Sequence, residues 1–531
     1  MKVALCQLNP LVGDLTGNAQ KIQDAAARAH AAGADLAVCP ELALCGYPPR
    51  DLLIRPSFIR DAMAALAALT VPVATIFGAP YAAGEQLFNA AILLMPGQPP
   101  QVFAKTLLPT YDVFDEARYF TPAVDMPPLL ELCGQRLGIS VCEDIWNDGA
   151  VHHYPRNPIA ALAGAGARVI INISASPFEA GKAELREQLV QDVARKHRIA
   201  VLYCNQVGGN DAILFDGTSL YVTEDARLVG RGARFAEDML LCDLRAQTST
   251  LAPALDAEAE LAQALTLGIR DYAHKCGFRT AVIGLSGGID SALTATLAAD
   301  ALGADNVFGV AMPSRYSSEH SLRDAEALAQ NLGGHFRTLP IEPTFAALRT
   351  TLDLRGTPQD DLAEQNLQAR IRGTMLMALA NRDGHLLITT GNKSELATGY
   401  CTLYGDMCGG LAAISDLYKG QVYALSHWLN RERERIPQNT LIKPPSAELK
   451  PGQLDQDTLP PYDVLDAILR AYVDERKPVG EIAGDPALIR RIARMVRLSE
   501  YKRRQAAPGL KVSPQAFGEG RRYPLAQGYS E

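Results

Sequence analysis

A short stretch in the second half of the chain limits the possible folds more than any other. The apolar run TAVIGLS (280–286) leads through two glycines into a helical stretch with Leu293, Leu297 and Ala301 on one face. The strand-like runs NVFGVAMP, HFRTLPI and HLLITTG follow, each separated from the next by a helical stretch. This alternation predicts a doubly wound parallel sheet. Because ligands bind at the carboxyl edge of such sheets, SGGIDS, SRYSSEHS and GNKSE are expected to meet in one crevice.

The loop SGGIDS has the features of an anion-binding site. Its glycines let the backbone approach an anion without interference from a Cβ atom, and the start of the following helix favours negative charge. Ser286 and Ser291 add hydroxyl donors. A Walker A loop would carry a lysine after its last glycine, and here that position is not lysine. The loop therefore fits the pyrophosphate that leaves when ATP is cut between its α- and β-phosphates; an ordinary glycine turn is the alternative.

The stretch SGGIDSA resembles the signature loop of the N-type ATP pyrophosphatases, and the segments around it are similar to those of NAD synthetases. These segments are MPSRYSSEHSLRDA, EQNLQARIRGTMLM, TTGNKSELATGY, YGDMCGG, ISDLYK and ELKPGQLDQDTLPPYDVLD. The resemblance implies that ATP adenylates the nicotinate carboxylate of deamido-NAD with release of pyrophosphate. Ammonia then displaces AMP from this NAD-adenylate and leaves NAD.

The same resemblance implies which residues form the second site. Those matching ATP contacts are Leu285, Ser286, Gly287, Gly288, Ile289, Asp290, Ser291 and Thr390. Those matching deamido-NAD contacts are Asn366, Glu395 and Lys502. Asp290 and Glu395 can supply hard oxygen ligands for Mg²⁺; the alternatives are a helix N-cap for Asp290 and a solvated acid for Glu395. Lys419 is either a phosphate-neutralising group or a surface lysine.

The first half contains its own set of strands and helices, and it predicts an α/β domain with buried sheets. Strands are expected at KVALCQLN, DLAVCPE, VATIFGAP, FNAAILLM, RLGISVCE, ARVIINIS and AVLYCNQV, and helices at 17–33, 57–69 and 183–198. Three residues there have potential chemistry. Glu41 and Cys142 end strands, and Lys105 lies in FAKTLLPTYDVF. Each alone has a plain alternative, namely a strand-end acid, a buried thiol or a surface amine.

As a set, Glu41, Lys105 and Cys142 resemble the catalytic triad of the nitrilase superfamily, together with PELALCGYPPRDLL, LLPTYDVFDEARYF and SVCEDIW. The resemblance implies a four-layer αββα sandwich that releases ammonia from glutamine. Cys142 attacks the amide, Glu41 transfers the proton and Lys105 stabilises the oxyanion. A neighbouring base or cation is expected to lower the pKa of the thiol. The residues matching glutamine contacts are Tyr111, Ser176 and Lys182, the last of which lacks the bidentate fork of an arginine.

Length and composition set the frame for the two halves. A chain of 531 residues exceeds one core, and AQTSTLAPALDAEAE lacks an apolar stripe. A glutaminase domain (1–245), a linker (246–260) and a synthetase domain (261–531) are therefore expected. The Pro- and Asp-rich segment 443–461 is expected to be a long surface loop, either a mobile lid or disordered.

Charge and cysteine content exclude several classes of protein. A net charge of −8 argues against a nucleic-acid-binding face, and no apolar run reaches the roughly 18 residues of a membrane span. Ten cysteines without CxxC or zinc-site spacing indicate reduced thiols and a cytoplasmic protein.

Both halves together predict a carbon–nitrogen ligase that makes NAD from deamido-NAD, ATP and L-glutamine, with an apolar channel that carries ammonia. The family resemblance implies a homo-oligomer built on paired synthetase domains. Two alternatives stay open. One is another ATP-pyrophosphatase amidotransferase; the other is an ammonia-only NAD synthetase whose first half is an inactive scaffold.

Overall fold

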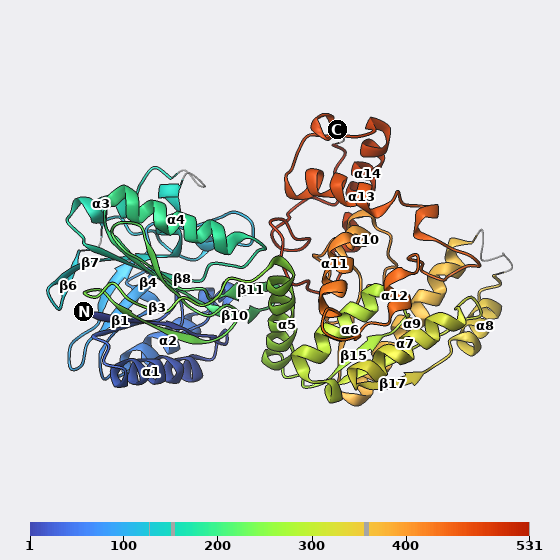
Figure 1. Ribbon diagram of the computed structural model, residues 1–531, viewed down its shortest axis with the longest axis horizontal. Helices are drawn as coiled ribbons and strands as arrows, with labels where there is room; N and C mark the ends of the chain where they lie inside the picture. Colours follow the sequence, from blue (N-terminus) through green and yellow to red (C-terminus); the bar gives the residue numbers. More distant parts are fainter. Residues whose placement is uncertain (127, 150–153, 355–360, 530–531) are drawn as a thin grey trace. The chain divides into compact units, whose positions relative to one another are not determined.

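A computed structural model describes the chain except for residues 127, 150–153, 355–360 and 530–531 (Figure 1). The chain forms two compact units, Met1–Leu255 and Asp256–Glu531. Their boundary falls inside the expected connection 246–260, but that segment is not all loop. β-Bridges at Thr248 and Leu251 tie its first part to the first unit. Helix α5 (Ala257–Lys275) begins earlier than residue 261 because the Asp256 side chain caps it.

The first unit contains two six-stranded sheets. The first sheet, in the order β14-β1-β2-β3-β4-β5, consists of β14 (Asp238–Asp243), β1 (Lys2–Gln7), β2 (Leu36–Val38), β3 (Ala74–Ala83), β4 (Gln86–Leu94) and β5 (Gln101–Ala104). The second, in the order β13-β12-β9-β8-β7-β6, consists of β13 (Leu228–Arg231), β12 (Leu220–Val222), β9 (Ala200–Asn205), β8 (Val169–Ser174), β7 (Gln135–Val141) and β6 (Leu130–Leu132). A hairpin of β10 (Val207–Asn210) and β11 (Ile213–Asp216) accompanies them.

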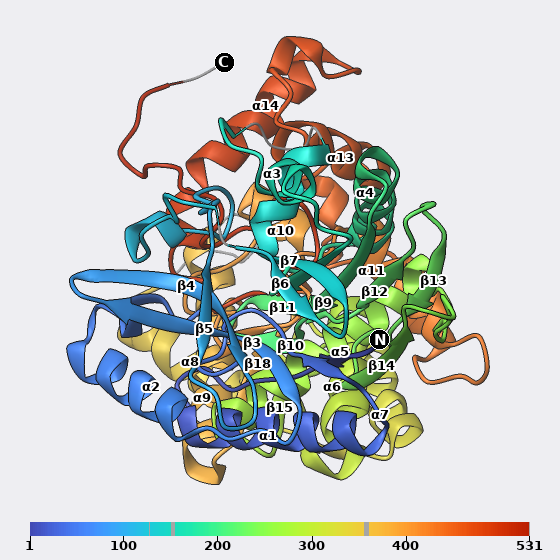
Figure 2. The same cartoon turned by 90° about the vertical axis from the view of Figure 1, so that its left-hand side faces the viewer.

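Alternation of side chains along the strands explains how the layers pack. Val3 and Leu5 of β1 lie in the core between the sheets, whereas Ala4 and Cys6 face the helices α1 (Leu15–Ala31) and α2 (Pro56–Ala68). The outer face of the second sheet packs against α3 (Pro158–Gly164) and α4 (Lys182–His197). Figure 2 shows these helix pairs on opposite sides of the strands. The predicted αββα sandwich is confirmed.

The second unit is built on a five-stranded parallel sheet in the order β17-β16-β15-β18-β19, which confirms the doubly wound prediction. Its strands are β17 (His335–Thr338), β16 (Val307–Ala311), β15 (Ala281–Gly284), β18 (Leu386–Thr389) and β19 (Leu411–Ala412). Helices α8 (Glu342–Thr351) and α9 (Leu362–Asp383) cover one face, and α6 (Ile289–Leu302) and α7 (Glu319–Leu332) contact the other.

A helical layer completes the second unit. It comprises α10 (Lys393–Thr398), α11 (Lys419–Leu429), α12 (Gln438–Ile442), α13 (Tyr462–Leu469), α14 (Pro486–Leu498) and α15 (Glu500–Arg503). The segment 443–461 is not the disordered loop of one expectation: Leu459 is buried in the core of this layer, and the Glu448 carboxylate accepts hydrogen bonds from Ser318 and Ser321. Residues 443–461, although they lack an apolar stripe, are thus held by one buried leucine and by polar contacts.

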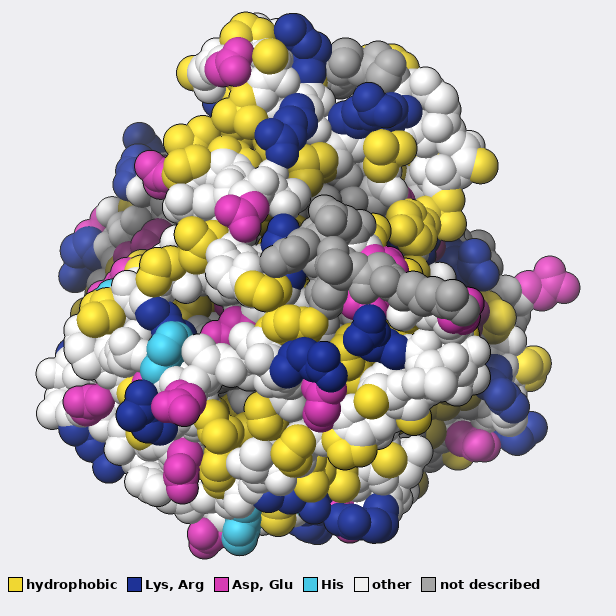
Figure 3. Space-filling model, turned by 90° about the vertical axis from the view of Figure 1, so that its right-hand side faces the viewer, with side chains coloured by type: hydrophobic (Ala, Val, Ile, Leu, Met, Phe, Trp, Pro, Cys, Tyr) yellow, Lys and Arg dark blue, Asp and Glu magenta, His cyan; other side chains and the backbone are white. Residues whose placement is uncertain are grey.

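The described residues show neither a membrane-spanning helix nor, on the face seen in Figure 3, a continuous basic surface. No described helix is both long and apolar enough to cross a membrane. On the face of the second unit seen in Figure 3, Lys and Arg side chains lie in separate groups among acidic and hydrophobic ones, not as one continuous basic surface.

Two candidate active sites

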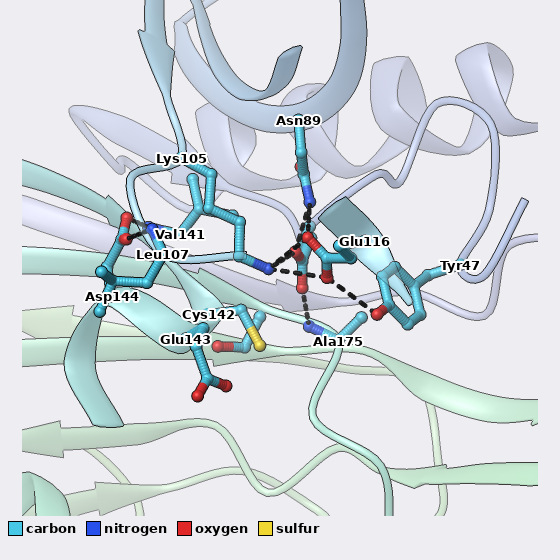
Figure 4. Close-up of polar contacts among 12 residues, drawn as sticks. Tyr47, Asn89, Lys105, Leu107, Glu116, Val141, Cys142, Glu143, Asp144 and Ala175 are labelled. Atoms are coloured by element: carbon cyan, nitrogen blue, oxygen red, sulfur yellow. Dashed lines mark hydrogen bonds and ion pairs between the residues drawn. The ribbon is translucent and has the colours of Figure 1, made fainter. Parts of the chain in front are cut away.

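Glu41, Lys105 and Cys142 come from three separate strand ends and lie together inside the first unit. Figure 4 shows Lys105 and Cys142 of this site. Glu41 follows β2, Lys105 follows β5, and Cys142 follows β7 at the start of the 3₁₀ segment η3 (Cys142–Gly149). All three are buried, with exposed fractions of 0%, 1% and 3%. The surface-amine alternative for Lys105 is therefore wrong.

Five hydrogen bonds fix the Glu41 side chain and its lysine, two of them from the Lys105 ammonium to the two oxygens of Glu116 at 2.8 and 2.9 Å. The Lys105 ammonium donates to Glu41 Oε1 at 2.7 Å and to a second carboxylate, Glu116, at 2.8 Å. Asn89 Nδ2 also donates to Glu41 Oε1 at 2.7 Å, and the Ala175 amide donates to Oε2 at 2.9 Å. Because both oxygens are held, Glu41 has a fixed orientation toward the interior of the site.

Glu116 is a site residue that the sequence interpretation missed, although it lies in the quoted stretch LLPTYDVFDEARYF. Its carboxylate also accepts a hydrogen bond from the Tyr47 hydroxyl at 2.9 Å. Burial raises the pKa of Glu116 to about 7, and the nearby Glu41 charge adds to this rise while Lys105 opposes it. The site thus holds one lysine between two carboxylates, one of which titrates near neutral pH.

Glu116 makes stability depend on pH. Its pKa rises from an ordinary 4.5 to about 7 on folding, so between these values the folded chain keeps a proton that the unfolded chain has lost. The contribution of protonated Glu116 to the free energy of unfolding is fully present below pH 4.5 and is lost as pH rises through about 7. We expect the thermal midpoint of the wild type to fall relative to Glu116→Gln between about pH 5 and about pH 8. The exposed Glu85→Gln serves as control, and parallel curves for Glu116→Gln and wild type would contradict the prediction.

The backbone at the nucleophile position is strained. Cys142 has φ of +41°, a conformation that residues with a Cβ atom rarely adopt and that clusters at functional sites. Close packing is equally specific at Gly78, where a Cβ would lie 2.0 Å from the Leu42 amide, directly after Glu41. The Asp144 carboxylate accepts hydrogen bonds from the amides of Thr106, Leu107 and Val141, which joins the Lys105 and Cys142 segments.

The expected lowering of the Cys142 pKa is wrong. Burial raises the pKa of this thiol well above its ordinary value, the negative charge of Glu41 adds to the rise, and Lys105 opposes it. The direction of this shift favours the neutral thiol over the thiolate, so a base is needed to take the proton.

The three candidate glutamine contacts lie in the same unit with different partners. The Tyr111 hydroxyl donates to Glu143 at 3.0 Å, and the Ser176 amide donates to Asn205 at 3.0 Å. The Lys182 ammonium lies 5.6 Å from the centre of the Trp146 ring. Glu143, next to the nucleophile and 1% exposed, is a second acid that the sequence interpretation did not assign.

The glycine-rich loop in the second unit connects β15 to α6. Gly287 has φ of +78°, and a Cβ there would lie 2.2 Å from the Ser321 carbonyl oxygen, so only glycine fits. Leu285 is buried, and the hydroxyls of Ser286 and Ser291 lie 3.2 Å apart. Gly288 is the N-cap of α6, and Ile289 is its first residue. The glycine loop thus runs directly into the first turn of α6, whose backbone amides follow those of the loop.

Asp290 lies beside groups from α10 and α11. Its Oδ1 accepts from Asn392 Nδ2 at 2.9 Å, and its Oδ2 contacts the Lys419 ammonium, which also reaches Glu395 at 3.4 Å. The N-cap alternative for Asp290 is wrong because Gly288 has that position. The surface-lysine alternative for Lys419 is wrong because this residue is 1% exposed.

Glu395 belongs to a capping box, not to a solvated helix start. Its backbone amide donates to the Asn392 side chain, and its carboxylate accepts from the Asn392 amide. Burial raises the pKa of Glu395 to about 8, with a further rise from the charge of Asp290 and opposition from Lys419. A second cation beside these carboxylates would lower that pKa.

The residues present fit a magnesium ion. Asp290 and Glu395 offer hard oxygen atoms, and one cationic group already contacts both. Among the described residues no cluster of three or more His, Cys, Asp or Glu side chains forms a closed metal site. Two carboxylates leave the remaining positions to water and phosphate oxygens, as Mg²⁺ commonly requires.

Two of the other three candidates, Lys502 and Asn366, contact one short segment after α10. Lys502 Nζ donates to the carbonyls of Gly399 and Cys401 at 2.7 and 2.6 Å. Asn366 Oδ1, on α9, accepts from Thr402 Oγ1 at 2.9 Å. Thr390 directly follows β18 at the carboxyl edge, where ligands bind in such sheets.

Comparison with known proteins agrees with this division. The family model described as carbon-nitrogen hydrolase matches residues 2–254, and that described as NAD synthase matches residues 261–506. The chain is 50% identical to a glutamine-dependent NAD(+) synthetase from Synechocystis sp., with 99% of each covered. It is 41% identical to the protein of that name from Thermotoga maritima, with 100% of this chain and 99% of the relative covered.

Two solved structures resemble the whole chain. The glutamine-dependent NAD+ synthetase from Acinetobacter baumannii, solved in complex with ADP, is 38% identical with a TM-score of 0.78, and the match covers 99% and 98% of the two chains. The enzyme of that name from Cytophaga hutchinsonii has a TM-score of 0.85 at 23% identity, over 99% and 98% of the chains, and supports the fold.

Proposed function

The chain belongs to the family of glutamine-dependent NAD(+) synthetases, and from its two sites we propose how it carries out their reaction. The first unit hydrolyses glutamine, and the second uses the ammonia and ATP to convert deamido-NAD to NAD, AMP and pyrophosphate. The observation that supports this most is the pairing, in one chain, of a buried Glu–Lys–Cys cluster with a lysine-free glycine loop.

In the first unit, the Cys142 sulfur attacks the side-chain amide carbon of glutamine while Glu41 takes the thiol proton. The Lys105 ammonium, which binds Glu41 and both oxygens of Glu116, supplies the positive charge that stabilises the oxyanion. Glu41 then gives the proton to the departing nitrogen as the C–N bond breaks. Water releases glutamate from the thioester and restores the thiol.

Recognition of glutamine requires one cation and one anion. We assign its carboxylate to Lys182 and its ammonium to Glu143, with Tyr111 and Ser176 as neighbouring polar contacts. A buried acid such as Glu143 needs a positive partner, which the ammonium supplies. This pairing would favour an amino acid over a simple amide.

In the second unit, a carboxylate oxygen of deamido-NAD attacks the α-phosphorus of ATP, and the bond to the bridging oxygen of pyrophosphate breaks. The amides and hydroxyls of residues 286–291 and the Lys419 ammonium bind the departing pyrophosphate. Asp290 and Glu395 would hold Mg²⁺, which would offset the negative charge of the phosphates. Thr390 contacts ATP, and Asn366, Glu395 and Lys502 contact deamido-NAD. Ammonia then attacks the acyl carbon, a proton is lost and AMP leaves.

The wider setting is part of the same proposal. The ten cysteines are thiols rather than disulfides, as in the reducing cytoplasm that we propose as the location. We expect a homo-oligomer built on paired synthetase domains, and an apolar route for neutral ammonia. Neither nucleic acid nor membrane is needed by this chemistry.

Product identification tests the function directly. With ATP, deamido-NAD and glutamine, we expect equal amounts of NAD, AMP, pyrophosphate and glutamate, measured by chromatography. The amide nitrogen of ¹⁵N-labelled glutamine should appear in the NAD carboxamide. Formation of ADP and inorganic phosphate would refute the adenylation step, and unlabelled NAD would refute the role of the first unit.

A further inference from the structure

We propose that Asp466 is a positioning residue of the second site, because its carboxylate joins the first turns of α10 and α11 and so fixes Lys419. The proposal rests on the proposed function of this unit. It concerns a residue of α13 that lies outside the glycine loop and outside the expected substrate contacts.

Asp466 makes one hydrogen bond to each of the two helices. Its Oδ1 accepts from the Ser394 hydroxyl at 2.6 Å, and Ser394 is the second residue of α10. Its Oδ2 accepts from the Gly420 amide at 2.9 Å, and Gly420 is the second residue of α11. With an exposed fraction of 6%, the carboxylate lies inside the protein between two helix N-termini, which favour negative charge.

The connection to Lys419 runs through its backbone. The Lys419 amide donates to Ser394 Oγ at 3.0 Å, and the Gly420 amide donates to Asp466. The first two amides of α11 are therefore both bound by the Asp466–Ser394 pair. The side chain of Lys419 starts from this fixed point and reaches Asp290 and Glu395. A shift of the α11 start would therefore move the ammonium away from the pyrophosphate loop.

The same face of α13 also contacts the lysine side chain. Tyr462 lies one helical turn before Asp466, and the centre of its ring is 5.3 Å from the Lys419 ammonium. One helix thus holds both the backbone and the side chain of Lys419. Burial raises the pKa of Asp466, and the hydrogen bonds that its carboxylate accepts from Ser394 and Gly420 oppose this rise.

The variant Asp466→Asn separates positioning from folding. Its amide has one oxygen, so either Ser394 or Gly420 loses its acceptor. Isothermal titration of the full-length protein with inorganic pyrophosphate and magnesium chloride should show a dissociation constant raised about tenfold, and ammonia-driven NAD synthesis should fall about 10- to 100-fold in kcat. Asp463→Asn, an exposed carboxylate on the same helix, should behave as wild type.

The titration distinguishes the possible outcomes. Partial unfolding would lower the number of binding sites per chain but leave the dissociation constant unchanged, and this result would overturn the proposal. Ser394→Ala removes the acceptor of the Lys419 amide but keeps the bond from Gly420 to Asp466, so it should also raise the dissociation constant. If the wild type makes NAD but Asp466→Asn has the same dissociation constant and kcat as Asp463→Asn, the positioning role is refuted and the proposed function is not. If the wild type makes no NAD, both are refuted.

Discussion

Replacement of Cys142 by alanine should abolish the use of glutamine and leave the use of ammonia intact. We expect glutamine-driven NAD synthesis to fall by at least about 1,000-fold, because the only atom that can form the thioester is removed. Synthesis from ammonium salts should stay within about twofold of wild type, since the second unit is built from its own residues. Both rates are measured as NAD formed at saturating ATP and deamido-NAD.

Cys133→Ala is the matched control for this experiment, because Cys133 is an exposed thiol of the same unit. It should retain both activities. Unchanged glutamine use in Cys142→Ala would instead favour the scaffold interpretation of the first half. Loss of both activities would show that the variant damages the whole chain.

The strands and the glycine loop could be predicted because they depend on local pattern, whereas the αββα sandwich and the three triad residues were predicted from the resemblance to the nitrilase superfamily. Apolar alternation located the strands, and residues that directly follow strands are delivered to a sheet edge whatever the rest of the chain does. The same reasoning located the glycine loop after β15. These features need only the order of elements along the chain.

The partners of those residues could not be predicted, since burial and pairing depend on distant segments. Glu116 lies in a 3₁₀ turn, and its burial and its contacts with Lys105 and Tyr47 distinguish it from neighbouring acids. Lys419 was ambiguous for the same reason, because the acid that it meets lies 129 residues earlier. The error over the Cys142 pKa has this origin too: residue types suggested a cation nearby, but the degree of burial, which has the larger effect, was unknown.

Replacement of Asp290 by asparagine should lower the rate of NAD synthesis from both nitrogen sources by about 100- to 1,000-fold, because a charge at the pyrophosphate site is lost. Glutamate release without deamido-NAD should remain within about twofold of wild type, since Glu41, Lys105 and Cys142 are untouched. The measurement compares NAD and glutamate formed by one preparation. Asp305→Asn, an exposed carboxylate of the same unit, is the control.

This variant tests charge more than folding. Asparagine keeps an acceptor for Asn392 or Lys419, and the loss of the Asp290 charge removes a repulsion that raises the pKa of Glu395. Glu395 should therefore ionise more easily and pair with Lys419 alone, which would pull the ammonium away from the glycine loop. Retention of ammonia-driven synthesis in Asp290→Asn would mean that Lys419 and the loop amides suffice for pyrophosphate, and that the two carboxylates serve only to hold the lysine.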